Sequence, residues 1–367
     1  MAKKQLAVIF GGRSGEHEVS LMSARSMLAV IDRQKYDVNE IGVTPQGRWF
    51  TGEKVLDALE TGKYDSLIPV VLLPEPRNGQ LFRIQGSTLE PLVQVDVVFP
   101  LIHGTFGEDG TLQGLLELAD LAYVGCGVLA SAVGMDKSLF KDVMRANHIP
   151  VVESLLFTRE QVSSRTREVM ENIEASLPYP VFVKPANLGS SVGITRCTSH
   201  SSLLEGLLDA ARFDRRVLVE RGIDAIECEV SVLGNENPIA SVPGEIRPVE
   251  DFYTYSAKYL TGTSELLIPA QLDVQTQEKL SELAIRAFQA IDGAGLARVD
   301  FLIDRASGEI FLSEVNTIPG FTSISMYAKL WQAAGITYAE LVDRLIDLAF
   351  LRKQQRDQTE HTFRRDE

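Results

Sequence analysis

The sequence predicts a mixed α/β (α+β) protein that begins with an open parallel α/β sheet. Residues 6–10 are continuously apolar, Gly11 and Gly12 follow, and apolar residues then recur at helical spacing from 19 to 31. This order of strand, glycine turn and helix is the opening of a βαβ unit. A second apolar run, residues 95–101, ends in a polar, glycine-rich loop, as expected where a parallel sheet carries its functional loops.

Composition places the chain among soluble globular proteins. It has 367 residues, of which 45% are hydrophobic and 23% charged, and its net charge is −14. A chain of this length predicts about two to three domains and can bury a substantial core, which excludes a disordered or collagen-like chain. The acidic balance argues against nucleic acid or an anionic membrane as partners, but it is compatible with a local cationic pocket for phosphate.

Targeting and cysteine signatures are absent from the sequence. Cys126, Cys197 and Cys228 are widely spaced and include no CxxC pair, so neither a disulfide framework nor a zinc ribbon is indicated. The first apolar run is too short for a secretory signal, and no apolar run reaches the roughly 18 residues of a transmembrane helix. We therefore expect a cytoplasmic protein.

The elements follow in order along the chain, with strands predicted where short apolar runs are bounded by turn residues. In the first half we expect strands at 6–10, 38–43 and 95–101 and a helix at 19–31, while prolines interrupt residues 51–91, for which no function is predicted. In the second half we expect a helix ending before Pro150, strands at 151–157, 181–183, 217–219, 227–233, 297–303 and 309–315, and an amphipathic helix at 275–291. The charged segment from 353 onward predicts a frayed tail.

The strongest chemical signal is a set of polar side chains on the last two predicted strands. Arg298 and Asp300 are two residues apart, as are Glu314 and Asn316, so each pair shares one face of its strand. The turn at 304–308 would pair the strands and bring these faces together. Two carboxylates and an amide oxygen suit Mg²⁺, and Arg298 would stabilise phosphoryl or oxyanion charge. The alternative is a surface salt-bridge ladder across the hairpin.

Two glycine-containing loops are candidates for anion binding. Residues 317–322 include Pro319-Gly320 and indicate a turn into a helix, whose free backbone N–H groups could hold an anion, or else an ordinary turn. Lys184 ends an apolar strand and precedes the Gly/Ser-rich residues 187–193, which form either a flap over phosphates or a plain hairpin loop. No GxxxxGK[ST] motif exists, which excludes a P-loop NTPase at the level of motifs.

Other polar residues near predicted element ends have two interpretations each. Glu16 either complements the dipole of the first helix or binds a substrate ammonium group. His103, at the mouth of the sheet, is either a functional residue or a structural or solvated histidine. Glu220 either faces a nucleotide base or ribose or ends a solvated strand, and the Tyr- and Lys-containing loop at 253–259 is either a binding lid or a packed surface loop.

Taken together, these stretches resemble the ATP-grasp family and, within it, the D-alanine–D-alanine ligases. The resemblance extends in order over residues 5 to 350, and its segments are specific as a set. These segments are FGGRSGEHEVS from Phe10, HGTFGEDGTLQG from His103, MDK from Met135, VKPANLGSSVG from Val183, YSAKY from Tyr255, RVD from Arg298 and EVNTIPG from Glu314.

The resemblance implies a three-domain ATP-grasp architecture. It places an N-terminal α/β domain at 1–136, a central subdomain with a phosphate flap at 137–219 and a C-terminal subdomain with the metal site and a lid loop at 220–352, followed by the tail at 353–367. ATP would lie between the last two. The implied reaction joins two D-alanines through a D-alanyl phosphate, releasing ADP and phosphate, for peptidoglycan precursor synthesis. Because an acyl phosphate hydrolyses in water, a closing lid is required.

The resemblance also implies roles for individual residues. Glu16 would take the first ammonium group, Arg298 and the Gly320 amide would form the oxyanion hole, and Ser325 would help to hold the second carboxylate. The remaining substrate contact is His103, and the lid would be latched by Ser190, Tyr259 and Glu16. The ATP contacts would be Lys137, Lys184, Ser190, Ser191, Glu220, Arg221, Ile223, Glu227 and Lys258. Two Mg²⁺ (or Mn²⁺) ions would be held by Asp300, Glu314 and Asn316. Arg221-Gly222 departs from the hinge sequence expected there.

Three other functions compete with this one. Another ATP-grasp carboxylate–amine ligase, or a depsipeptide ligase that makes a D-lactate ester, is the main alternative, although Tyr259 favours an amine acceptor. The absence of GxGxxG argues against a nicotinamide dehydrogenase, and the presence of Arg298, Asp300 and Glu314 argues against a non-catalytic ATP sensor. The expected partners are D-alanine and ATP, without nucleic acid or membrane, and the candidate assembly is a homodimer.

Overall fold

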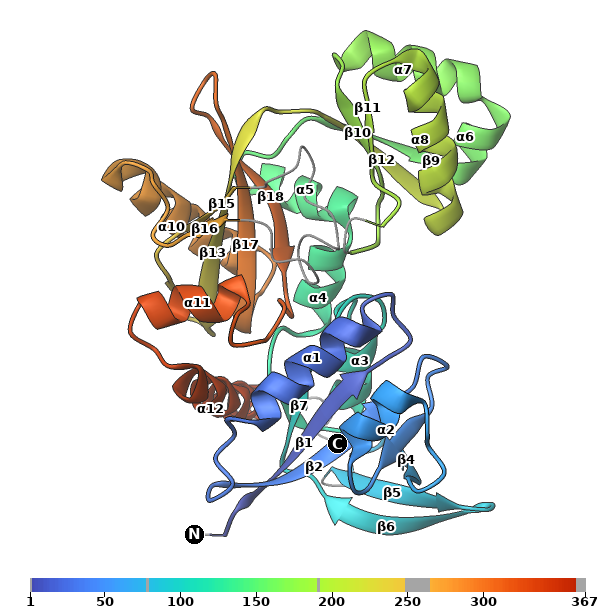
Figure 1. Ribbon diagram of the computed structural model, residues 1–367, viewed down its shortest axis with the longest axis vertical. Coiled ribbons are helices and arrows are strands. Elements are labelled where there is room, and N and C mark those ends of the chain that lie inside the picture. Colours follow the sequence, from blue (N-terminus) through green and yellow to red (C-terminus); the bar gives the residue numbers. More distant parts are fainter. Residues whose placement is uncertain (1, 77–78, 190–191, 248–264, 361–367) are drawn as a thin grey trace, which may run out of the picture.

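The computed structural model describes residues 2–76, 79–189, 192–247 and 265–360 (Figure 1). Within these ranges the strands form three sheets, each built from its own stretch of the sequence. The described helices include none with the length and apolar character of a membrane-spanning segment.

The N-terminal sheet confirms the predicted βαβ opening. β1 (Lys4–Gly11) leads through the glycine turn into α1 (His17–Leu28) and pairs in parallel with β2 (Tyr36–Val43). On its other side β1 pairs in parallel with β7 (Val97–Pro100), which in turn pairs in parallel with β8 (Ala122–Tyr123). The apolar runs of β1 and β7 are buried, as expected for inner parallel strands covered on both faces.

Antiparallel strands extend this sheet. They come largely from residues 51–91, the proline-interrupted stretch for which no function is predicted. The full strand order is β6-β5-β4-β3-β2-β1-β7-β8. Pro91 lies on β6, the edge strand of this sheet, which is where proline is found within sheets. The added elements are β3 (Trp49–Thr51), α2 (Val55–Thr61), β4 (Ile68–Leu72), β5 (Gln80–Gln85) and β6 (Thr88–Gln94).

The second sheet is antiparallel, has the order β11-β10-β12-β9, and carries α6, α7 and α8 beside it (Figure 1). The strand predicted at 151–157 begins only at Ser154, because Val151 instead forms an isolated bridge to Leu312 in the third sheet. The elements of this sheet are β9 (Ser154–Thr158), α6 (Arg159–Ser164), α7 (Thr166–Ser176), β10 (Val181–Pro185), β11 (Thr195–Cys197), α8 (His200–Phe213) and β12 (Arg216–Arg221).

The third sheet has the order β16-β15-β13-β17-β18, with β14 paired to β13. The predicted amphipathic helix is confirmed as α10 (Val274–Ala290), which buries its apolar stripe, including Leu280 and Phe288, in the core shared with β13 and β17. The strands are β13 (Ala225–Gly234), β14 (Ile239–Ala240), β15 (Gly244–Arg247), β16 (Glu265–Leu267), β17 (Gly295–Asp304) and β18 (Ile310–Asn316).

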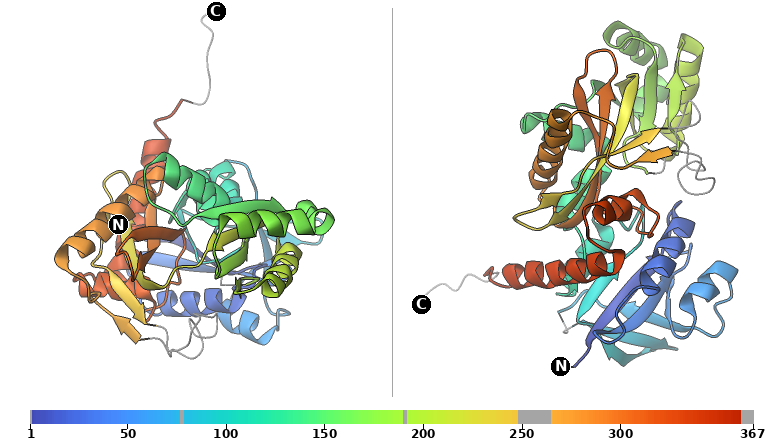
Figure 2. Two further views of the ribbon diagram at one scale, coloured as in Figure 1. Left: turned by 90° about the horizontal axis from the view of Figure 1, so that it is seen from above. Right: turned by 60° about the vertical axis from the view of Figure 1, so that its left-hand side comes forward.

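Helices connect the sheets, and the last one returns to the N-terminal sheet (Figure 2). Leu341 and Leu345 of this helix, α12, share an apolar core with Phe10 of β1 and Phe99 of β7. The last helix of the described residues therefore packs against the first strand. The connecting helices are α3 (Thr111–Leu118), α4 (Val128–Met135), α5 (Lys137–Ala146), α11 (Met326–Ala333) and α12 (Tyr338–Arg356).

The prediction of a frayed tail from residue 353 is wrong for the end of α12. Lys353 Nζ lies 3.0 Å from an Asp120 carboxylate oxygen, and Arg356 donates to Glu117. Both carboxylates belong to the N-terminal part of the chain, so the charges that suggested a solvated tail form ion pairs with a distant segment. Residues 361–367 lie outside the described residues.

Candidate active site

The predicted polar cluster forms on the hairpin of β17 and β18. In this antiparallel pair Arg298 lies opposite Asn316 and Asp300 lies opposite Glu314. Arg298 donates from Nε and Nη2 to the two oxygens of Asp300, both at 2.7 Å. Val299, between them, points to the other face of the sheet and is fully buried. The hairpin therefore presents one apolar face to the core and one charged face to the site, as the alternation of the strands predicts.

Glu229, which the sequence analysis missed, completes this cluster. It lies on β13 opposite Asp300, is buried, and has a carboxylate oxygen 3.0 Å from Arg298 Nε. Arg298 is therefore held between two carboxylates. An available signal was that Glu229 lies two residues after Glu227, which was selected, so that both carboxylates share one face of the strand.

The side chains predicted to bind metal fit a hard divalent cation. Asn316 Nδ2 lies 3.0 Å from Asp300 Oδ2 and 3.4 Å from Glu314 Oε1, so both carboxylates and the amide converge. Turning the amide over presents its oxygen instead, which gives three oxygen ligands of the kind that Mg²⁺ prefers. Over the described residues no group of three or more His, Cys, Asp or Glu side chains is arranged for a metal. A three-ligand donor set on this hairpin would therefore have to include the Asn316 amide.

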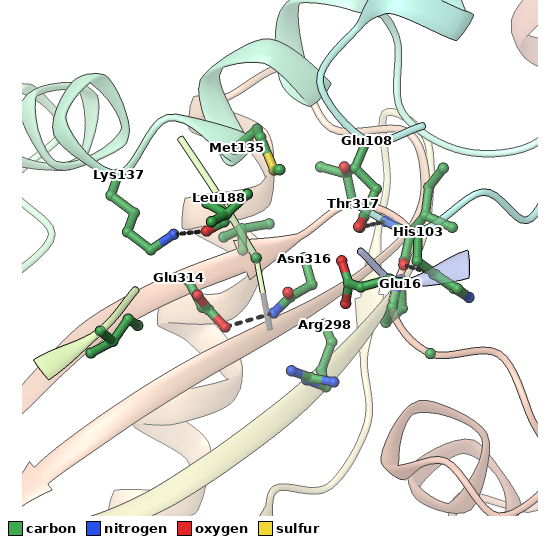
Figure 3. A pocket seen from close by; sticks show the side chains of 17 residues that line it. Glu16, His103, Glu108, Met135, Lys137, Leu188, Arg298, Glu314, Asn316 and Thr317 are labelled. Atoms are coloured by element: carbon green, nitrogen blue, oxygen red, sulfur yellow. Dashed lines mark hydrogen bonds between the residues drawn. The ribbon is translucent and has the colours of Figure 1, made fainter. Parts of the chain in front are cut away.

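Lys137 reaches the same region from the start of α5. Asp136 caps this helix by accepting from the backbone N–H groups of Ser138 at 3.2 Å and Leu139 at 3.0 Å. The Lys137 ammonium group donates to the Leu188 carbonyl in the flap segment (Figure 3). Burial lowers the pKa of Lys137. A buried ammonium group gains most from an anionic partner, which a phosphate would supply.

Lys184 and Glu220 form an ion pair between β10 and β12. The register places Phe182 opposite Glu220, and Lys184 is two residues further along the same face. Lys141 of α5, which sequence reasoning missed, lies 2.7 Å from the other oxygen of Glu220. Burial alone would raise the pKa of Glu220, but the two ammonium groups outweigh it and lower that pKa to about 2. Lys141 is one helical turn after Lys137, a spacing that could have identified it.

A cavity between the sheets is lined by Lys137 and by three side chains of the hairpin, Arg298, Glu314 and Asn316 (Figure 3). Glu16, at the start of α1 as predicted, faces Asn316 and Arg298 across it. A Cβ added at Gly104, where φ is +73°, would lie 2.4 Å from Glu16 Oε2, and one at Gly189 would lie 3.0 Å from it. The loop after β7 and the flap segment therefore both contact this carboxylate. The ionisable and amide side chains of the lining are Glu16, His103, Glu108, Lys137, Arg298, Glu314 and Asn316.

His103 lines the cavity, but both of its ring nitrogens are already bonded. Nδ1 lies 2.9 Å from the Ile318 carbonyl and Nε2 lies 2.8 Å from Ser23 Oγ. Burial lowers the pKa of His103, which favours the neutral imidazole. These contacts favour the structural interpretation of His103 over a direct role with substrate.

Glu108 is a further residue of the cavity that the sequence analysis did not select, although it lies in one of the quoted motifs. Its two carboxylate oxygens accept from the backbone N–H groups of Gly104 at 2.6 Å and Ile318 at 3.0 Å. Burial, and then the nearby Glu16 carboxylate, raise the pKa of Glu108 to about 8. Glu108 therefore ties the loop after β7 to the turn after β18.

Comparisons with known proteins identify the family. A model described as the D-ala D-ala ligase N-terminus matches residues 5–126, and one described as the D-ala D-ala ligase C-terminus matches residues 143–347. The chain belongs to the D-Ala–D-Ala ligase family. It is 50% identical to the D-alanine–D-alanine ligase of Heliobacterium modesticaldum, over 98% of this chain and 99% of that one. It is 48% identical to that of Ruminiclostridium cellulolyticum, over 96% of each.

Solved structures of the same family have the same fold. VanG D-Ala:D-Ser ligase from Enterococcus faecalis is 36% identical, with a TM-score of 0.84 over 95% of this chain and 100% of that chain. The D-alanine–D-alanine ligase from Coxiella burnetii is 34% identical, with a TM-score of 0.81 over 98% of this chain and 97% of that chain. The predicted fold class is therefore confirmed.

In this D-Ala–D-Ala ligase family member, the residues predicted to contact the nucleotide do not all line the same cavity. Lys137 lines the cavity, whereas Lys184, Glu220, Ile223 and Glu227 lie outside the lining that the described residues form. The Arg221 side chain points elsewhere, over the Phe311 ring with 5.7 Å to its centroid. Its Nε lies 3.6 Å from Glu153, in a separate groove. The side chain of Arg221 is therefore directed away from the cavity, and its backbone N–H donates to the Glu153 carbonyl at 3.1 Å.

The remaining predicted residues fall into two groups. Gly320 lines the cavity, while Ser325 precedes α11 and accepts a hydrogen bond from the Thr322 N–H at 3.1 Å. Ser325 is thus near the turn but engaged in its local structure. The predictions for Ser190, Ser191, Lys258 and Tyr259 lie outside the described residues.

Proposed function

We propose that this member of the D-Ala–D-Ala ligase family joins two D-alanines, converting ATP to ADP and phosphate, and so supplies D-alanyl-D-alanine for peptidoglycan precursors. The observation that carries the proposal is the convergence on one cavity of Lys137, Glu16 and the hairpin cluster around Arg298. The relatives named D-alanine–D-alanine ligase, which match nearly the whole chain at up to 50% identity, support the same conclusion.

Two steps make the chemistry feasible. A carboxylate resists attack by an amine because oxide is a poor leaving group. In the first step a carboxylate oxygen of one D-alanine takes the γ-phosphoryl group, and ADP leaves. In the second step the deprotonated amine of the other D-alanine forms a bond to the acyl carbon, and the C–O bond to phosphate breaks. Both steps collect negative charge that cationic groups and N–H donors must stabilise.

The residues on the substrate side suit these demands. Glu16, at the rim of the N-terminal sheet, is a carboxylate suited to the ammonium group of the first D-alanine. Arg298 is anchored by Asp300 and Glu229, so its guanidinium is fixed before substrate arrives. Gly320 lines the same cavity, and its backbone N–H would supply a second donor. Fixed donors cost little reorganisation during the reaction, which supports an oxyanion hole made of Arg298 and Gly320.

The phosphate side requires several cations. Lys137 is within reach of the cavity, and Lys184 would exchange its contact with Glu220 for a phosphate. Asp300, Glu314 and Asn316 would hold divalent metal, which when bound neutralises charge on the transferring phosphoryl group. We propose two such ions, Mg²⁺ or Mn²⁺.

Exclusion of water is the remaining requirement, because the acyl phosphate would hydrolyse. The flap residues Leu188 and Gly189 already line the cavity and contact Lys137 and Glu16. Closure of this segment, with Ser190, Ser191, Lys258 and Tyr259 taking the predicted roles, would shield the intermediate. This lid belongs to a proposed arrangement of three domains at 1–136, 137–219 and 220–352, with ATP between the last two. A homodimer stays a prediction that sedimentation would test.

The identity of the second substrate, which accepts the acyl group, requires a separate test. One structural neighbour is named as a D-Ala:D-Ser ligase, which makes D-serine the second candidate acceptor beside D-alanine. Phosphate release from ATP should be measured with D-alanine, L-alanine, D-serine and D-lactate, and the products identified by mass spectrometry. D-alanyl-D-alanine is the expected main product at neutral pH. Dominance of the D-serine dipeptide or the D-lactate ester in a competition would overturn the D-alanine acceptor, and no ADP formation with any of them would overturn the ligase.

A further inference from the structure

The turn after β18 is held on both sides by side chains from distant helices. Phe321 N–H donates to Ser23 Oγ of α1 at 3.2 Å, and the Phe321 carbonyl accepts from the Tyr338 hydroxyl of α12 at 2.7 Å. The Ile318 carbonyl, on the other side of Pro319-Gly320, lies 2.9 Å from His103 Nδ1. The backbone therefore has fixed points both before and after Gly320.

The hydrogen-bond partners assign a direction to this network. The Ile318 carbonyl can only accept, so His103 Nδ1 carries the proton and Nε2 has a lone pair. Ser23 Oγ, 2.8 Å from Nε2, then donates its proton to the ring and uses a lone pair for the Phe321 N–H. Ser23 and His103 are both buried, so each of these groups has a partner without help from water.

The Phe321 side chain adds an apolar anchor to the same turn. It is fully buried, with its ring centroid 5.4 Å from that of Phe99 on β7 and 5.2 Å from that of Tyr338. Any displacement of the Phe321 backbone would therefore disrupt the close packing of its side chain in the core. The adjoining Gly320 N–H is different, because among the described residues none accepts a hydrogen bond from it.

We propose that Ser23 and Tyr338 are positioning residues of the ligase reaction, holding the Phe321 peptide so that the neighbouring Gly320, which lines the cavity, stays in place. Neither side chain belongs to the cavity lining that the described residues form, so both act through the turn. The inference rests on the proposed function, in which Gly320 and Arg298 stabilise the oxyanion. Donors of this kind act only when held in place before charge develops.

Because these hydrogen bonds would position a catalytic donor, we expect their removal to lower kcat and to leave substrate binding nearly unchanged. Ser23→Ala removes both the acceptor for the Phe321 N–H and the donor to His103, and Tyr338→Phe removes a single hydroxyl while keeping the ring. A displacement of about 1 Å, or loss of one oxyanion donor, lowers kcat about 100-fold or more. We expect kcat to fall about 10- to 100-fold in Ser23→Ala and less in Tyr338→Phe, since these variants loosen the donor without deleting it.

A matched control separates positioning from general damage. Tyr327→Phe also deletes a buried tyrosine hydroxyl, one that donates to the Val232 carbonyl at 3.1 Å and not to the turn. For each variant, kcat, the KM values for ATP and D-alanine, and the unfolding midpoint would be measured. The proposal expects lower kcat with nearly unchanged KM for ATP in Ser23→Ala and Tyr338→Phe, and wild-type kcat in Tyr327→Phe. If Ser23→Ala does not fold, Tyr338→Phe decides.

Two results would overturn the proposal, and a third concerns the function itself. An unchanged kcat in Tyr338→Phe, or a fall no larger than that of Tyr327→Phe, would show that the turn needs no such support. A change confined to KM would assign these residues to binding instead. Absence of D-alanine-dependent phosphate release in the wild type would overturn the proposed function, an outcome distinct from an active wild type with equally active variants.

Discussion

The buried carboxylate of Glu220 is expected to be essential for local stability, apart from any role with nucleotide. It lies between Lys141 and Lys184, whose side chains are 2% and 18% exposed. Glu220→Gln removes the negative charge and leaves two ammonium groups beside each other. Lys184 can turn toward solvent or a phosphate, but Lys141 is enclosed and cannot.

The size of the effect follows from this burial. Removing one partner of a buried ion pair typically costs about 3–5 kcal/mol, because the other charge stays buried without compensation. This corresponds to a rise of roughly a hundred- to several-thousand-fold in the constant for local opening, at about 1.4 kcal/mol per factor of ten. Replacing both charges in Glu220→Gln/Lys141→Met should recover most of the loss, since neutral pairs in such places are often as stable as the ion pair.

Hydrogen exchange measured by mass spectrometry reports this opening locally. Peptides that contain β10 and β12 should exchange faster in Glu220→Gln and return toward wild-type rates in the double variant. Glu282→Gln, which breaks an exposed pair with Lys279, is the control and should leave exchange unchanged. Wild-type exchange in Glu220→Gln would refute the reasoning, and so would a double variant that is less protected than the single one.

Three further predictions concern the cavity. Glu314→Gln should abolish D-alanine-dependent phosphate release through lost metal binding, and near-normal turnover would remove Glu314 from the mechanism. Gly104→Ala should destabilise the protein by at least about 1–2 kcal/mol and impair turnover, because its Cβ would meet Glu16 at 2.4 Å with φ at +73°. Gly86→Ala, with φ at +60° and open space around it, is its control, and thermal unfolding compares the two. Because folding raises the pKa of Glu108 from 4.5 to about 8, its contribution to stability is complete below pH 4.5 and is lost as pH rises to about 8. Unfolding midpoints across this range should therefore fall less steeply in Glu108→Gln than in the wild type.

The local sequence pattern was sufficient to predict a residue's contacts where its partners lie nearby in the sequence. The pairing of Arg298 with Asp300 and the register of Asp300 with Glu314 follow from strand periodicity and a short turn. The position of Glu16 at the start of α1 follows from the glycine turn before it. In each case the distance along the chain is short enough for backbone geometry alone to place the side chains.

The local sequence pattern did not predict the contacts of a side chain whose partner comes from a remote segment. Lys353 looked like part of a solvated tail, yet it pairs with Asp120. Lys141 and Glu229 were not selected from the sequence, yet each is buried against a predicted site residue, Glu220 and Arg298 respectively. Composition and periodicity carry no information about which distant element will cover a given charge.

The sequence by itself determined the fold class, the hairpin with its charged face, and the family, because all of these depend on residue types at short spacings. Only the tertiary structure decided that His103 is engaged through both nitrogens, that Arg221 points away from the cavity, and that the turn at Gly320 is held from α1 and α12. The physical reason is that hydrogen bonds and burial depend on which surfaces meet, and the packing of three sheets brings together surfaces that lie far apart along the chain.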